Sequence, residues 1–108
     1  DSIHIEVVDK RNVFIPNIFT PNFDGTNDFF TVFGEMPNVQ EVEEMLVFDR
    51  WGGQVFEQKS FLPNDLSNGW DGTQNGVSLN NGVFVYVAKV RFWDNKVIVY
   101  HGDISLIR

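Results

Sequence analysis

Residues 83–93 read VFVYVAKVRFW, and this stretch decides the class of fold. Every second side chain in it is apolar or aromatic, in the order Phe84, Tyr86, Ala88, Val90 and Phe92. Lys89 and Arg91 fall in the opposite set, so we expect the first set to face a core. A period of two over this length predicts a long β-strand with one buried face.

Shorter apolar runs lie on both sides of this strand and are separated by turn residues. They predict further strands at residues 2–8, 13–15, 29–33, 42–49, 54–58, 96–101 and 103–107. Residues 42–58 are expected to form a hairpin, and Asp94-Asn95 predicts a two-residue hairpin turn of the left-handed type. About seven or eight strands without a convincing helix predict an all-β fold, an immunoglobulin-like antiparallel β-sandwich.

Composition bounds the size of the fold and excludes several classes of function. The 108 residues are expected to form a single domain, 1–108, in which residues 1–12 are either an edge strand or the approach from a preceding domain. Hydrophobic residues make up 43% of the chain, enough for one core. The absence of cysteine excludes disulfides and thiolate zinc sites. A net charge of −7 makes nucleic acid and anionic lipid poor partners.

The turn-rich segment at residues 59–81 contains an isolated tryptophan, Trp70, which we expect to pack into the edge of the core. Trp51 and Trp93 also stand beside turns. The three tryptophans are either stacking platforms for sugar rings or packing residues at the end of the sandwich, and we favour packing.

The segment at residues 15–30, IPNIFTPNFDGTNDFF, contains a dense cluster of oxygen-bearing side chains in a turn. Asn22, Asp24, Thr26 and Asp28 alternate as calcium ligands do on a tight loop. The loop is not an EF-hand, because Thr20 and Thr31 occupy its first and twelfth positions. Either it binds Ca²⁺ or its side chains bond their own backbone, and we favour the second interpretation.

No catalytic site is expected. His4 and His101 lack further zinc ligands, and no serine sits on a glycine-flanked elbow. Glu43 and Glu44 are neighbours on a predicted strand, so we expect them to point to opposite faces. Arg50 could contact a partner or pair with an acidic neighbour such as Asp49, and we favour a third interpretation, a solvated charge in the turn.

Several segments together resemble one family, the gliding-motility-associated C-terminal domain, also called the type B sorting domain of the type IX secretion system of Bacteroidota. They are residues 14–28 (FIPNIFTPNFDGTND), 47–56 (VFDRWGGQVF), 70–72 (WDG) followed by Gly76, 82–86 (GVFVY) and 102–108 (GDISLIR). The resemblance covers nearly all of residues 13–108, apart from residues 59–68, and its most specific parts are the opening motif and the Arg-Trp-Gly hairpin. Phe23 is a departure, since the family usually has glycine or another small residue there.

The resemblance implies a non-enzymatic secretion signal at the C-terminus of large exported proteins, including cell-surface adhesins. It implies two partners, the type IX translocon and a PorP/SprF-like outer-membrane protein. The cargo would cross the periplasm and reach the cell surface or the medium. We expect a monomer without cofactor, apart from the calcium alternative, and we expect Asp1 to be a cut within a longer chain that ends at Arg108.

We expect the recognition surface to combine the loop at 22–28, the hairpin at 50–53 and a terminal edge strand at 104–108. Its residues are Phe23, Arg50, Trp51, Gly52, Ile104, Leu106 and Arg108. An edge strand offers unpaired backbone groups, so we expect β-augmentation by the translocon. The alternatives are a calcium-stabilised adhesive or carbohydrate-binding module, and a passive spacer domain.

Overall fold

Nine β-strands and one short 3₁₀ helix make up the regular structure of residues 13–21, 28–35 and 38–107, which the computed structural model describes. They are β1 (Val13–Phe14), β2 (Ile18–Phe19), β3 (Phe33–Gly34), β4 (Val39–Phe48), β5 (Gln54–Phe61), η2 (Leu66–Asn68), β6 (Thr73–Gln74), β7 (Val77–Ser78), β8 (Gly82–Phe92) and β9 (Val97–Leu106). No α-helix occurs within these ranges, so the all-β prediction is confirmed. The strand predicted at residues 2–8 lies outside them.

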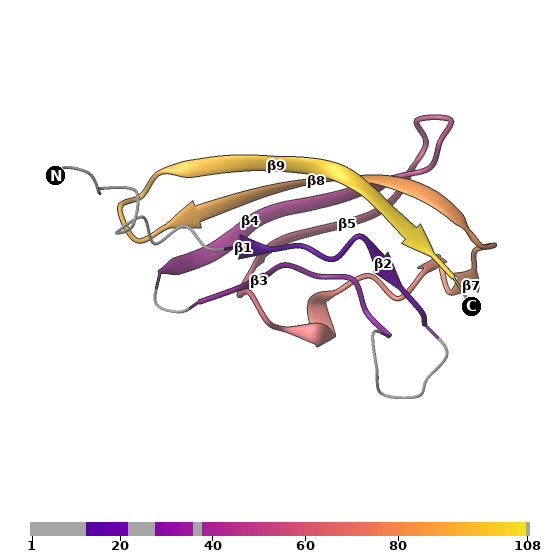
Figure 1. Ribbon diagram of the computed structural model, residues 1–108, viewed down its shortest axis with the longest axis horizontal. Helices are drawn as coiled ribbons and strands as arrows, with labels where there is room; N and C mark the ends of the chain where they lie inside the picture. Colours follow the sequence, from indigo (N-terminus) through magenta and orange to yellow (C-terminus); the bar gives the residue numbers. More distant parts are fainter. Residues whose placement is uncertain (1–12, 22–27, 36–37, 108) are drawn as a thin grey trace, which may run out of the picture.

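The long strands form one five-stranded sheet in the order β2-β9-β8-β4-β5 (Figure 1). The predicted strand at 83–93 is β8, and the predicted hairpin at 42–58 is the antiparallel pair β4–β5. The strand β2 joins β9 in parallel, through Ile18 opposite Ser105 and Phe19 opposite Leu106. The main sheet is therefore mixed, where the sequence predicted a purely antiparallel one.

A thinner second layer covers one face of the sheet and completes the β-sandwich. It contains the β1–β3 pair, the short helix η2 and the β6–β7 hairpin, and Figure 1 shows β1, β3 and η2 on one side of the long strands. The predicted strand at 29–33 is not continuous. Phe33 belongs to β3, and Phe30 forms an isolated bridge with Trp70, in which each backbone N–H donates to the other residue's carbonyl oxygen at 2.8 Å.

Trp70 lies at the centre of the core between the two layers. Its side chain is 1% exposed, and its indole Nε1 donates to the carbonyl oxygen of Thr73 at 2.9 Å. The ring centroids of Phe19 and Phe84 lie 5.3 Å and 5.1 Å from that of Trp70. Burying an aromatic of this size is a large apolar contribution, and the hydrogen bond satisfies its polar atom. The prediction that Trp70 packs into the core is confirmed.

The alternation predicted for β8 is also confirmed. Its inward set consists of Phe84, Ala88, Val90 and Phe92, which are buried, and Tyr86, which is partly buried against the core. The opposite set carries Lys89 and Arg91, which form ion pairs with glutamates of β4.

Bulges in β4 place Glu43 and Glu44 on the same face of the sheet. The register of β4 against β8 shifts between Val42 and Glu44. Glu43 accepts a hydrogen bond from Arg91 at 2.8 Å, and Glu44 lies 3.4 Å from the Lys89 ammonium nitrogen. The prediction that these glutamates face opposite ways is wrong, because an extra residue in a bulge breaks the period of two. Both carboxylates are engaged by cations on the outer face.

The turn between β8 and β9 is one residue longer than predicted. Phe92 donates its backbone N–H to the carbonyl oxygen of Lys96 at 2.9 Å, and Asn95 donates to that of Phe92 at 2.8 Å. The loop therefore comprises residues 93–95, and Asn95 has a left-handed φ of 66°. This is the pattern of a three-residue hairpin loop. The strands predicted at 96–101 and 103–107 are one continuous strand, β9.

Candidate functional site

The turn between β4 and β5 presents Arg50 and Trp51 on a fixed backbone. Asp49 and Gly53 bond across the turn, with the N–H of Asp49 donating to the carbonyl oxygen of Gly53 at 2.8 Å. The Oδ1 atom of Asp49 accepts from the backbone N–H groups of Trp51 at 2.9 Å and Gly53 at 2.8 Å. Gly52 has a φ of 86°, a conformation that strains residues with a side chain. These contacts order the turn before any partner arrives.

Trp51 and Arg50 are stacked and open to solvent. The Trp51 side chain is 86% exposed, and the Arg50 guanidinium carbon lies 5.8 Å from the centroid of its ring. Asp49 is used by the turn, and no carboxylate of the described residues lies within ion-pair distance of Arg50. The alternative in which Arg50 pairs with Asp49 is therefore wrong, and the guanidinium is exposed, as expected for a solvated charge in a turn.

A cavity of about 210 Å³ opens beside this turn. Arg50 and Trp51 line one part of it, and the amide residues Gln74, Asn80 and Asn81 line another. Gln74 also ties β6 to this region, since its Nε2 donates to the carbonyl oxygen of Gln54 at 3.4 Å. The cavity therefore combines amide groups with the apolar side chains of Val55, Leu79, Val83 and Phe84, beside an exposed cation and an exposed ring.

Two of the three segments predicted to form the recognition surface lie at the same end of the sheet. Phe48, the last residue of β4, pairs with Val85, and Gly82, the first of β8, pairs with Leu106 near the end of β9. Figure 1 shows the β4–β5 turn and the C-terminal end of β9 together at this end. Of the third segment, the loop at 22–28, only Asp28 is described. The predicted site residues Asn22, Phe23, Asp24 and Thr26 lie outside the described residues, as does Arg108.

The terminal strand is not a free edge. Ser105 donates its backbone N–H to the carbonyl oxygen of Asn17 at 2.9 Å, and Ile107 donates to that of Phe19 at 3.1 Å. The side chains of Ile104 and Leu106 are fully buried. The prediction that these residues meet the translocon along an unpaired edge is corrected, because β2 already occupies that edge. A two-residue parallel strand has no recognisable pattern in the sequence.

The structure does not assemble a metal centre from its described parts. In residues 13–21, 28–35 and 38–107, no group of three or more His, Cys, Asp or Glu side chains is arranged to hold a metal ion. Of the predicted calcium ligands only Asp28 is described; it is partly buried and already makes a contact within the protein. The calcium site stays a prediction.

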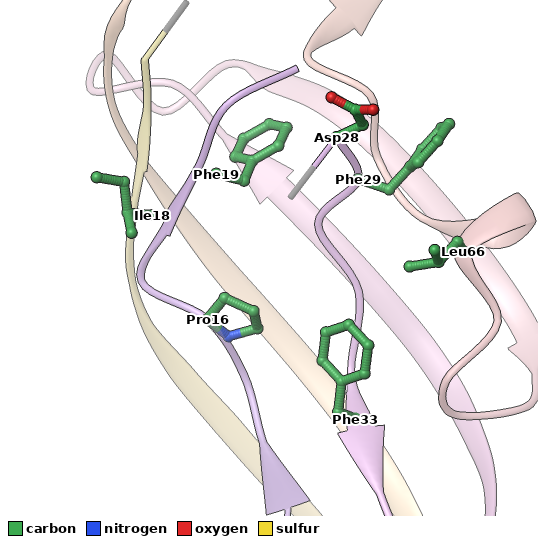
Figure 2. Close-up of a pocket in the computed structure, with 7 residues that line it drawn as sticks. All are labelled: Pro16, Ile18, Phe19, Asp28, Phe29, Phe33 and Leu66. Carbon is green, nitrogen blue, oxygen red and sulfur yellow. The ribbon is translucent and has the colours of Figure 1, made fainter. Parts of the chain in front are cut away.

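A second cavity, of about 230 Å³, was not anticipated from the sequence (Figure 2). Its lining residues are Pro16, Ile18, Phe19, Asp28, Phe29, Phe33 and Leu66. Figure 2 shows Pro16 and Phe33 on opposite sides of it, with Leu66 contributed by η2. The lining is mainly apolar, with Asp28 as its one carboxylate among the described lining residues, so this groove offers chiefly packing contacts. Apolar residues of the motif at 15–30 form much of it, but their meeting depends on tertiary contacts.

The model of the family described as the CHU_C type IX secretion signal domain matches residues 13–104. The chain belongs to this family. The resemblance noted from the motifs is confirmed, and the match includes the Arg50–Trp51 turn of this secretion signal domain. No curated protein matches the chain.

Membership gives the type IX secretion signal domain a role in export toward the cell surface or the extracellular space, together with the type IX machinery. A helix with the length and hydropathy to cross a membrane is not found in the described residues.

Proposed function

We propose that this domain is a folded, non-catalytic address that directs a large cargo protein through the type IX translocon, by way of the periplasm, to the cell surface or the medium. The observation that carries the proposal is the family match over residues 13–104. A short linear tag would need no core, whereas this domain buries large side chains such as Trp70, Phe30 and Phe92. The core therefore serves to hold a surface in shape.

The surface that the machinery reads lies, in this proposal, at the end of the sheet with the β4–β5 turn. Arg50, Trp51 and Gly52 are exposed there on a hydrogen-bonded turn. A translocon subunit and a PorP/SprF-like outer-membrane protein are the proposed partners of the monomeric domain. Phe23 and Arg108 are further proposed contacts.

The alternative is a calcium-stabilised adhesive or carbohydrate-binding module, which the exposed ring of Trp51 favours. In this alternative Asn22, Asp24, Thr26 and Asp28 would hold the ion. A glycan array probed with and without a chelator separates the two functions, because a sorting signal should bind no sugar under either condition.

The export test fuses residues 1–108 to the C-terminus of a fluorescent passenger that carries an inner-membrane export signal. The fusion is expressed in a gliding bacterium with an intact type IX system and in a translocon-deficient strain, each with the outer-membrane partner. We expect the passenger outside the first strain and in the periplasm of the second. A folded fusion that stays in the periplasm of both strains would contradict the proposal.

A further inference from the structure

We propose that Arg50 and Trp51 form a binding site for a carboxylate carried by a protein of the type IX apparatus. The inference rests on the proposed function and deepens it, because it names the chemistry by which the signal is read. It replaces the predicted contact along the terminal strand, whose edge is occupied by β2.

The charge pattern singles out Arg50 as a cation that has no ion pair with any described residue. The ion pairs of the described cations join Lys59 to Glu57 (3.2 Å) and Glu44 (3.8 Å), Lys89 to Glu44 (3.4 Å), and Arg91 to Glu41 (2.9 Å) and Glu43 (2.8 Å). In the described part of the chain, only Arg50 and Lys96 lack such a pair, although the whole sequence has 15 acidic residues and 8 Lys and Arg. A guanidinium can bind a carboxylate with two parallel hydrogen bonds, and this geometry suits Arg better than Lys.

The turn orients this guanidinium in advance. Asp49 accepts the N–H groups of Trp51 and Gly53, which fixes the backbone that carries Arg50. The Trp51 ring lies beside the guanidinium, so the cation–π contact limits the rotamers of both side chains. Binding then loses less side-chain entropy than it would with a free arginine. Exposed Trp and Arg side chains are also the types that dominate the energy of protein interfaces.

Because the domain is acidic, a single carboxylate on a protein is a better candidate ligand for Arg50 than a polyanion is. A net charge of −7 repels an anionic polysaccharide or nucleic acid over a long range, because many negative charges approach together. A single Asp or Glu interacts mainly at short range, through the hydrogen bonds that the Arg50 guanidinium can donate. Figure 1 shows the β4–β5 turn projecting from this end of the sheet. A Cβ at Gly82 would lie 3.9 Å from Arg50 Nη2, so a partner that reaches Arg50 also meets the first residue of β8.

The first step of the test locates the partner. A photo-crosslinking amino acid replaces Gln54, which is exposed next to the turn, in the passenger fusion, and cells with an intact type IX system are irradiated. We expect a crosslinked peptide from an outer-membrane protein of the apparatus that contains Asp or Glu near the crosslink. A crosslink to glycan, a peptide without a nearby acid, or no crosslink from an exported and folded fusion would overturn the proposal.

The second step tests the charge. Arg50→Glu should lower both crosslink yield and export at least about tenfold, the loss expected for a charge-assisted hydrogen-bonded pair. Replacing the partner's acid with Arg should restore both. Lys96→Glu is the matched control, since Lys96 is an exposed cation that also has no ion pair with a described residue and lies beside the turn at the other end of the sheet. Export of the Lys96→Glu fusion should stay at the wild-type level.

Two results of this second step would also overturn the inference. One is equal export of the Arg50→Glu and Lys96→Glu fusions, and the other is a charge reversal that restores neither crosslink nor export. Thermal melts of both variants check that the fold is intact. Export of the wild-type fusion in the two strains tests the proposed function separately, so a failure of that function and a failure of the carboxylate site give different results.

Discussion

At the scale of single residues, the hydroxyl of Thr31 is an unsatisfied polar atom in the core. Thr31 is fully buried and its Oγ1 has no hydrogen-bond partner. We predict that Thr31→Val, which replaces the hydroxyl with a methyl group of similar shape, raises the free energy of unfolding by about 1 kcal/mol. Urea denaturation measures the change.

The control for this substitution is Thr73→Val. The hydroxyl of Thr73 donates to Asp71 Oδ1 at 2.7 Å, so this variant loses a hydrogen bond and should be less stable than the wild type. A destabilised Thr31→Val protein would mean that the hydroxyl has a favourable partner, such as a buried water.

Tyr86 should make stability depend on alkaline pH. Burial raises its pKa above the ordinary value of 10.0, and the nearby charge of Asp103 raises it further. The folded state therefore holds the phenolic proton more tightly than the unfolded state. This contribution is fully present below pH 10 and is lost as the pH rises through the folded pKa. Tyr86→Phe should show a smaller fall in melting temperature above pH 10 than the wild type, and identical slopes would contradict the prediction.

At the scale of elements, the bridge that joins Phe30 to Trp70 depends on a close approach at Gly69. A Cβ at position 69 would lie 2.9 Å from the carbonyl oxygen of Phe30 and 3.2 Å from the Cβ of Phe29. We predict that Gly69→Ala pushes these segments apart and lowers the free energy of unfolding by about 1–3 kcal/mol. Gly82→Ala is the control, because its nearest neighbour would be 3.9 Å away. Chemical denaturation of both variants should show a clear difference, and equal stability would refute the steric argument.

The long elements could be predicted from the sequence because their side chains alternate. Phe84 to Phe92 in β8 keep a strict period of two, so the strand and its buried face were both correct. The bulges in β4 leave no recognisable pattern in the sequence. The prediction that Glu43 and Glu44 point to opposite faces was therefore wrong. The strand β2 exists only because Ile18 and Phe19 meet β9, a contact that no local pattern encodes.

In the candidate site, too, some features could be predicted from local sequence and others depend on tertiary contacts. Arg50 and Trp51 were found because the motif around them is distinctive in the sequence. Their stacking, and the loss of Asp49 as a partner, depend on the geometry of the turn. The apolar groove in Figure 2 joins Pro16, Phe33 and Leu66 from separate segments, so it became visible only in three dimensions.

At the scale of the whole molecule, the folded state itself should be the signal. Trp70→Ala removes a ring that packs against Phe19, Phe56 and Phe84. We predict a loss of about 3–5 kcal/mol in the free energy of unfolding, a large part of the stability of a small domain. Export of the passenger fusion should fall together with the folded fraction measured by circular dichroism. Normal export of an unfolded Trp70→Ala fusion would show that a linear segment is sufficient as the secretion signal.

The parallel pairing of β2 with β9 makes this part of the fold depend on nearly the full length of the domain. Ile18 and Phe19 form a strand only with Ser105 and Leu106, which lie far along the chain. Contacts between such distant residues form slowly. A domain truncated before Ser105 keeps Arg50 and Trp51 but cannot pair β2 with β9. We therefore expect truncated products to fold incompletely and to be exported less well, although they carry the exposed turn.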